Sequence, residues 1–389
     1  MAADLMGGEP IIVAARRTPI GTAAHAFKAV PVDRLAGPVI GALARDVACL
    51  GAPIEDVVLG NCMGPGGNLA RVSALGAGLG EAVPGVTVDR QCGSGLAAIL
   101  LAGQAVRSEE MDLVIAGGAE SASTAPLRVH RGRAGEPGVP YERAPFAPEG
   151  HPDPDMGAAA EALAAACGVD RDRQDRYACA SHAKAVAARA AGRFGEEIVP
   201  IAGRAEDQRP RLLRPASLSR LPAAFVPGGS VTAGNSSPVS DGAAAVVLVS
   251  ERLRAAAGLP GLRLRAGAVV GCDPALPGWG PVPAVRRLLG RTGVSMERIT
   301  AVEIVEAFAA QTLAVTDALG LDPLGADRDR VCADGGALAL GHPWGATGAV
   351  VVTRLFTRLV RSGAPPGTLG LAMAAVGGGL GVAALFEVV

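Results

Sequence analysis

The sequence lacks a charge excess, a long apolar segment and a paired-cysteine motif, and each absence removes a class of function. Its 36 basic and 37 acidic residues nearly cancel, so neither nucleic acid nor an anionic membrane surface is expected as the main partner. No segment has the uninterrupted apolar length that spans a bilayer, and residues 1–6 lack a charged-then-apolar targeting signal. We therefore predict a cytoplasmic protein.

Cysteine and histidine are scattered through the chain. There is no CxxC pair and no repeated cysteine and histidine pattern with metal-ligand spacing, so neither a disulfide framework nor a zinc site is expected. The seven cysteines are Cys49, Cys62, Cys92, Cys167, Cys179, Cys272 and Cys332. An acid–base role for imidazole must come from one of five residues, His25, His130, His151, His182 and His342.

Alternating apolar strands and helices predict an α/β fold. A chain of 389 residues is too long for one ordinary core and indicates two or three layered units. Residues 10–15, 56–60 and 112–118 have the apolar runs of buried strands, whereas residues 32–49 and 68–79 have helical spacing. This alternation predicts an open, largely parallel sheet with helices on both faces.

The pattern then changes. Residues 121–154 have no period and are rich in Arg, Pro and Gly, which predicts a surface excursion of the kind that often holds substrates. Helical spacing resumes over residues 156–167 and 171–192, and a loop at 232–237 precedes a buried element at 241–249.

The last third repeats the first. The glycine turn at 341–348 leads into apolar residues 349–352, as residues 92–95 lead into a buried helix, and residues 369–379 echo the strand at 112–118. We therefore predict two copies of one fold.

Cys92 is the candidate nucleophile because it stands where a β-rich run gives way to that helix. The positive end of a helix favours thiolate over thiol, although a buried, inert cysteine fits the position as well. His342, in the matching turn of the second copy, is the candidate base, with a capping histidine as the alternative. The glycines at 377–379 allow bare N–H groups to approach a ligand, or form only a permissive turn.

These segments together resemble the thiolases over nearly the whole chain. The resemblance rests on ARRTPIG at 15–21, NLAR at 68–71, CGSGL at 92–96, GNSS with DGAAA at 234–245, and GGALALGHP at 335–343. Blocks in the family's order are far more specific than any lone glycine pattern.

The resemblance implies a thiolase-like α/β fold of two pseudo-equivalent βαβαβαββ halves, packed as layered sheets, with a loop domain. The halves are residues 1–119, whose sheet is completed by a strand near 240–250, and residues 250–389; residues 120–249 would hold coenzyme A. The family's properties further imply an acyltransferase that is a homodimer or homotetramer, uses a coenzyme A thioester as substrate and binds no cofactor tightly.

The resemblance also assigns roles to single residues. Cys92 would carry the acyl group, and His342 would activate the Cys92 thiol. The N–H groups of Cys92 and Gly377 would form an oxyanion hole. The positions that line the pantetheine or acyl channel would be Met156, Phe225, Ser237 and Phe308. Arg211 would lie near the nucleotide.

Three positions depart from the family. A second catalytic cysteine is replaced by Ala375, the asparagine of an Asn-Glu-Ala-Phe motif by Val305, and a frequent histidine by Asp155. Losing the acid–base group would cost roughly 3 to 5 kcal/mol of barrier, and losing the oxyanion donor roughly 3 kcal/mol more. Val305 also excludes the Cys-His-His arrangement of decarboxylating ketosynthases.

Three hypotheses follow. In the first, Cys92 takes an acyl group from acyl-CoA or a carrier thioester and passes it to an activated carbon, a hydroxyl or an amine of a small-molecule acceptor. In the second, the protein is an ordinary acetyl-CoA C-acetyltransferase or 3-ketoacyl-CoA thiolase with a replacement base such as Glu303 or Glu306. In the third, it is a non-catalytic coenzyme A-binding subunit.

Overall fold

The computed structural model describes residues 8–389. The expected absence of a targeting signal over residues 1–6 therefore lies outside the described residues. No helix within 8–389 combines the length and the apolar character needed to cross a membrane.

The strands follow the apolar runs of the sequence closely, and residues 56–60 form a strand with the predicted bounds. In chain order they are β1 Pro10–Arg17, β2 Gly21–Thr22, β3 Asp56–Gly60, β4 Val86–Val88, β5 Leu113–Ser121, β6 Arg128–His130, β7 Val139–Tyr141, β8 Ser240–Ser250, β9 Leu262–Gly271, β10 Ile299–Ile304, β11 Leu369–Val376 and β12 Leu380–Val388.

Each helix predicted from the sequence is present; α1 and α2 end three residues earlier than predicted and α5 ends two residues earlier, whereas no prediction was made for α6 to α10. The helices are α1 Val32–Asp46, α2 Leu69–Gly76, α3 Ser94–Arg107, α4 Met156–Cys167, α5 Arg171–Ala190, α6 Pro215–Leu218, α7 Glu251–Ala257, α8 Pro281–Thr292, α9 Ala309–Ala318, α10 Ala337–Leu340 and α11 Trp344–Phe356.

Within residues 8–389, ten strands form one sheet in the order β10-β11-β12-β9-β1-β8-β5-β3-β4, with β2 paired to β8. The prediction of a largely parallel sheet is wrong, because only the β10–β11, β3–β4 and β3–β5 pairs are parallel. The turn at 377–379 joins β11 to β12 as an antiparallel hairpin. Residues 122–239, called the excursion from here on, connect the end of β5 to the start of β8. The chain leaves and re-enters the sheet at the same edge, so β8 runs antiparallel to β5.

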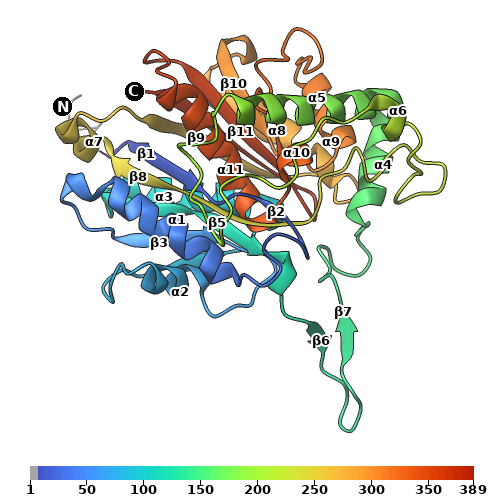
Figure 1. Ribbon diagram of the computed structural model, residues 1–389, viewed down its shortest axis with the longest axis horizontal. Coiled ribbons are helices and arrows are strands. Elements are labelled where there is room, and N and C mark those ends of the chain that lie inside the picture. Colours follow the sequence, from blue (N-terminus) through green and yellow to red (C-terminus); the bar gives the residue numbers. More distant parts are fainter. Residues whose placement is uncertain (1–7) are drawn as a thin grey trace.

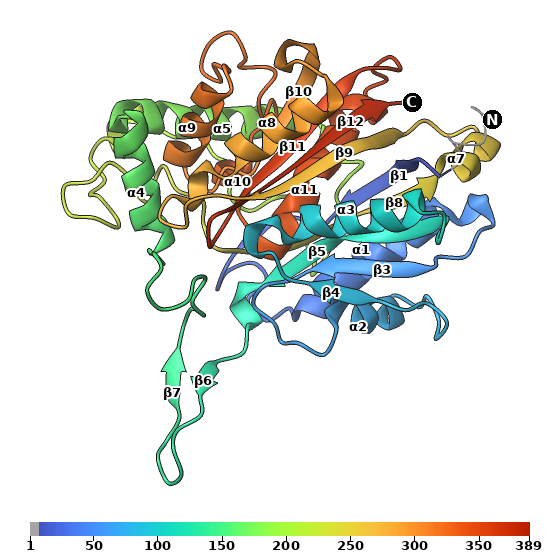
Figure 2. The same ribbon diagram turned by 180° about the vertical axis from the view of Figure 1, so that it is seen from behind.

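The strands of the first half of the chain, together with β8, meet the strands of the second half, β9–β12, at the middle of this sheet. β1 and β9 pair through only two residue pairs, and helices α3 and α11 lie between the halves (Figure 2). The two helices approach closely because each carries glycine at the crossing: a Cβ on Gly95 would lie 2.8 Å from the Ala349 nitrogen, and one on Gly348 would overlap Leu96.

The excursion after β5 has two parts. The β6–β7 hairpin extends far from the rest of the molecule (Figure 1). Helices α4 and α5 then pack against α9 and α10 of the second half, around a separate apolar cluster. The excursion therefore covers the second half of the molecule rather than forming a separate body.

Candidate functional site

Cys92 lies in a single 3₁₀ turn, Gln91–Gly93, between β4 and α3. Gln91 has a positive φ of 45°, a backbone conformation that is uncommon for a side-chain-bearing residue. The Ser94 hydroxyl fixes the turn, because it accepts from the Arg90 N–H and donates to the Gln91 carbonyl, both at 2.7 Å. The sulfur is thus presented by a rigid, locally hydrogen-bonded turn.

The protonation state of Cys92 differs from the prediction. Burial raises the pKa of its thiol to about 12. The N–H groups of Cys92 and Gly377 donate toward the sulfur and oppose this rise, while the Glu120 carboxylate adds to it. The prediction of a favoured thiolate at the helix N-terminus is therefore wrong: desolvation outweighs the helix end, and Cys92 rests as a thiol. The two N–H groups implied for the oxyanion hole are thus the two that lower the pKa of this thiol.

His342 is buried just before α11 and is held in one tautomer. Thr347 Oγ1 lies 2.7 Å from His342 Nδ1 and also donates its single proton to the Pro343 carbonyl at 2.7 Å. Thr347 can therefore only accept from the ring, which places the ring proton on Nδ1. The lone pair remains on Nε2, which is buried and has no hydrogen-bond partner among residues 8–389. Burial lowers the pKa of His342 to about 4, so the ring is neutral at physiological pH and can accept a proton.

A buried carboxylate joins the loop after β3 to the segment that carries His342. Glu120, at the end of β5, accepts from the backbone N–H groups of Cys62 (3.1 Å) and Met63 (3.1 Å), from the Asn61 amide (2.8 Å), and from the Gly345 N–H (3.0 Å) in the first turn of α11. The Cys92 turn also contacts α11. Neither Glu120 nor Thr347 was predicted from the sequence. The position of Glu120 at the end of a buried strand could have indicated a functional carboxylate.

The four predicted channel residues gather at the start of α4. The Phe225 ring packs on Gly157, next to Met156, and makes an edge-to-face contact with Phe308 at a centroid distance of 5.9 Å. The Ser237 N–H donates to the carbonyl of the residue before Phe308 at 2.9 Å. Segments 156–157, 225, 237 and 308 therefore converge although they are distant in sequence.

Arg211 belongs to a different group. Its guanidinium donates to the Arg209 carbonyl at 3.3 Å. Burial, with help from the positive charges of Arg211 and Arg209, lowers the pKa of His182 to about 3. This basic cluster lies within the excursion, between α5 and the loop that carries Arg209 and Arg211.

The two main departures are neighbours. The Val305 N–H donates to the Met373 carbonyl at 3.0 Å, and Ala375 follows two residues later on β11, paired with Gly381. β10 and β11 are parallel, so both residues lie at the carboxyl ends of adjacent strands. An apolar edge therefore stands at the two positions where the resemblance implied an amide and a thiol. The third departure, Asp155, is exposed and lies 4.0 Å from the Arg143 guanidinium.

Both carboxylates considered as replacement bases are already engaged. Glu306 accepts from the Tyr177 hydroxyl (2.8 Å), the Ser181 hydroxyl (2.7 Å) and the Leu338 N–H (3.2 Å). Glu303 is ion-paired with Arg358 at 2.6 Å. These contacts argue against either residue as a proton carrier.

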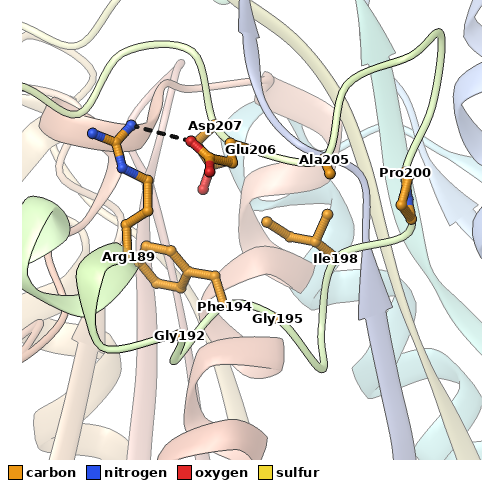
Figure 3. Close-up of a pocket in the computed structure, with 9 residues that line it drawn as sticks. All are labelled: Arg189, Gly192, Phe194, Gly195, Ile198, Pro200, Ala205, Glu206 and Asp207. Carbon is orange, nitrogen blue, oxygen red and sulfur yellow. Dashed lines mark ion pairs between the residues drawn. The ribbon is translucent and has the colours of Figure 1, made fainter.

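A cavity of about 270 Å³ lies elsewhere, between the end of α5 and the loop that follows it (Figure 3). An ion pair between Arg189 and Glu206 at 3.7 Å spans its rim. None of the predicted site residues lines it, so we do not assign the chemistry to this cavity.

Comparisons with known proteins agree with the fold. The family description "Thiolase, N-terminal domain" matches residues 10–252, and "Thiolase, C-terminal domain" matches residues 260–388.

Similar proteins cover the whole chain. The "Putative acetyl-CoA C-acetyltransferase YhfS" of Bacillus subtilis is 41% identical over 382 residues, which is 97% of this chain and 99% of the relative. The "Acetyl-CoA acetyltransferase" of Pseudomonas aeruginosa is 40% identical over 394 residues, 96% of this chain and 98% of the relative. The crystal structure of the Bacillus anthracis acetyl-CoA acetyltransferase superposes with a TM-score of 0.89 at 36% identity, covering 98% of this chain and 99% of that one.

Proposed function

The chain belongs to the thiolase family and is an acyltransferase, and we propose that it forms an acyl-enzyme on Cys92 and passes the acyl group to an acceptor that needs no second catalytic cysteine. One observation carries this proposal. A histidine with a free Nε2 lone pair and two oxyanion donors is retained, beside an edge made apolar by Val305 and Ala375.

The first half-reaction uses only groups that the chain has. His342 Nε2 accepts the thiol proton of Cys92 as the sulfur attacks the carbonyl carbon of the acyl-CoA. The N–H groups of Cys92 and Gly377 receive the developing oxyanion. The intermediate then collapses, the bond from the carbonyl carbon to the coenzyme A sulfur breaks, and the leaving thiolate takes the proton from His342.

The second half-reaction limits the acceptor. Ordinary Claisen condensation needs a base that removes an α-proton and a donor for the second oxyanion, and Ala375 and Val305 supply neither. Their loss costs roughly 3 to 5 kcal/mol plus roughly 3 kcal/mol. An acceptor that is already activated, such as an acidic methylene, a phenolic carbon, a hydroxyl or an amine, avoids both penalties.

Coenzyme A would enter through the excursion. We assign residues 120–249 to its binding, with the cluster at Met156, Phe225, Ser237 and Phe308 around the pantetheine or acyl part and Arg211 near the nucleotide. Coenzyme A acts here as a substrate, and no tightly bound cofactor is required.

We further propose a homodimer or homotetramer. β4 ends the sheet order, which leaves a strand edge free for pairing. Around this edge, α2, α3 and β4 expose apolar side chains, namely Val72, Leu75, Val86 and Leu101.

The names of the relatives favour a second candidate, an ordinary acetyl-CoA C-acetyltransferase. It would need a replacement for the missing thiol, and the contacts that already engage Glu303 and Glu306 oppose the two carboxylates considered for that role. The third candidate is a non-catalytic subunit. It does not explain why Thr347 holds His342 in the tautomer that can act as a base.

Intact mass spectrometry after incubation with acetyl-CoA tests the proposal. We expect an acetyl adduct on the parent protein and none on Cys92→Ala, while Cys62→Ala, which changes the neighbouring thiol, keeps the adduct. A parent protein that remains unmodified would rule out both enzymatic candidates.

A further inference from the structure

Phe146, in the excursion, lies directly on the turn that supplies one oxyanion donor. A Cβ on residue 377 would lie 2.7 Å from Cε2 and 2.9 Å from Cδ2 of the Phe146 ring, and one on Gly378 would lie 3.0 Å from the Phe146 carbonyl oxygen. The ring and the Gly377 backbone are therefore in van der Waals contact, with no room between them for a substrate atom.

Neighbouring charges hold this ring in place. The Arg143 guanidinium lies 4.6 Å from the ring centroid and forms an ion pair with Asp153 at 2.8 Å. Asp153 also accepts from the Phe146 N–H at 3.2 Å, and Asp155 lies on the other side of Arg143 at 4.0 Å. The ring is thus part of a small braced unit just before α4, where the channel residues gather.

The position of the acyl group follows from the oxyanion donors. A carbonyl oxygen bound by the N–H groups of Cys92 and Gly377 lies about 3 Å from the Gly377 nitrogen. Because the Phe146 ring covers Gly377, the atoms that follow the carbonyl carbon meet the ring within a few bonds. A short acyl group fits beside it, whereas a longer chain requires the ring to move.

We propose that Phe146 is a specificity-determining residue whose ring closes the acyl pocket beside Gly377 and restricts the donor to short acyl thioesters. This inference rests on the proposed acylation of Cys92. It also explains the contacts among Arg143, Asp153 and Asp155, because these residues hold the loop that carries the Phe146 ring.

The test measures single-turnover release of coenzyme A from acetyl-CoA and from hexanoyl-CoA. We expect Phe146→Ala to raise the ratio of the hexanoyl to the acetyl rate constant by at least about tenfold, the usual scale for space in an apolar pocket, and Phe146→Trp to lower it. Tyr141→Ala truncates an aromatic ring of the same excursion that stacks on His130, so it should leave the ratio unchanged.

The outcomes separate this inference from the proposed function. If the parent and Phe146→Ala both acylate and their ratios agree within about twofold, the inference is overturned and the acyltransferase proposal stands. If Phe146→Ala does not fold, Phe146→Leu must shift the ratio in the same direction, and an unchanged ratio overturns the inference. If neither donor acylates the parent protein, the proposed function fails, and this inference fails with it.

Discussion

The hydroxyl of Thr347 should set the rate of Cys92 acylation although it touches neither the sulfur nor a substrate. It accepts from His342 Nδ1 at 2.7 Å and thereby keeps the lone pair on Nε2. Thr347→Val retains the side-chain shape but leaves a buried N–H unpaired, which costs about 1 to 3 kcal/mol. It also removes the preference for the tautomer that can act as a base. We therefore expect the acylation rate constant at saturating acetyl-CoA to fall by about 5- to 150-fold.

The same helix supplies a matched control for this experiment. Thr353 is also buried on α11, and its hydroxyl donates to the Ala349 carbonyl at 2.9 Å without contacting a histidine. Thr353→Val should acylate at nearly the parent rate, and Thr347→Ser should recover most of the loss. Rapid-quench mass spectrometry gives the rate constants. Equal rates for Thr347→Val and Thr353→Val would refute the tautomer argument.

Further predictions concern protonation and the missing groups. Since the pKa of Cys92 is raised to about 12, alkylation of Cys92 by iodoacetamide, followed by peptide mass mapping, should accelerate about tenfold per pH unit between roughly pH 7 and 10; a plateau at neutral pH would contradict a resting thiol. Ala375→Cys combined with Val305→Asn should raise acetoacetyl-CoA formation by about two to four orders of magnitude, and no gain would show that other features block condensation. Because the pKa of His342 is lowered to about 4, the unfolded chain binds the extra proton first, and the contribution of His342 to the free energy of unfolding should fall by about 3 kcal/mol as the pH drops from 6.5 to 4. Denaturant titrations should show a smaller fall for His342→Gln; an equal fall would assign the acid sensitivity to other groups.

Sequence periodicity predicted local structure well because it records which faces are buried. Residues 56–60 and 156–167 carry clear apolar patterns, and both elements have the predicted bounds. Strand direction was not predictable in this way, because β8 reaches its place only after a long excursion and pairing is a property of distant segments.

The site shows the same division between local and distant causes. The motifs identified Cys92 and His342 together with the glycine turns, all of which are local signals. The protonation of Cys92 was mispredicted because the desolvation of its thiol comes from distant segments, since the 91–93 turn packs against α11 and β11 of the second half. Glu120 was not found because its partners lie 58 and 225 residues away, and the role of Thr347 depends on the direction of one hydroxyl proton.

The most direct test of the account follows the acetyl group on Cys92 after excess acetyl-CoA is added. The acetyl-enzyme should form, persist and yield no acetoacetyl-CoA beyond a trace, because Ala375 and Val305 replace the groups that condensation needs. Rapid conversion of the acetyl-enzyme to acetoacetyl-CoA would contradict the account and would establish an ordinary acetyltransferase with a proton carrier that the structure does not identify.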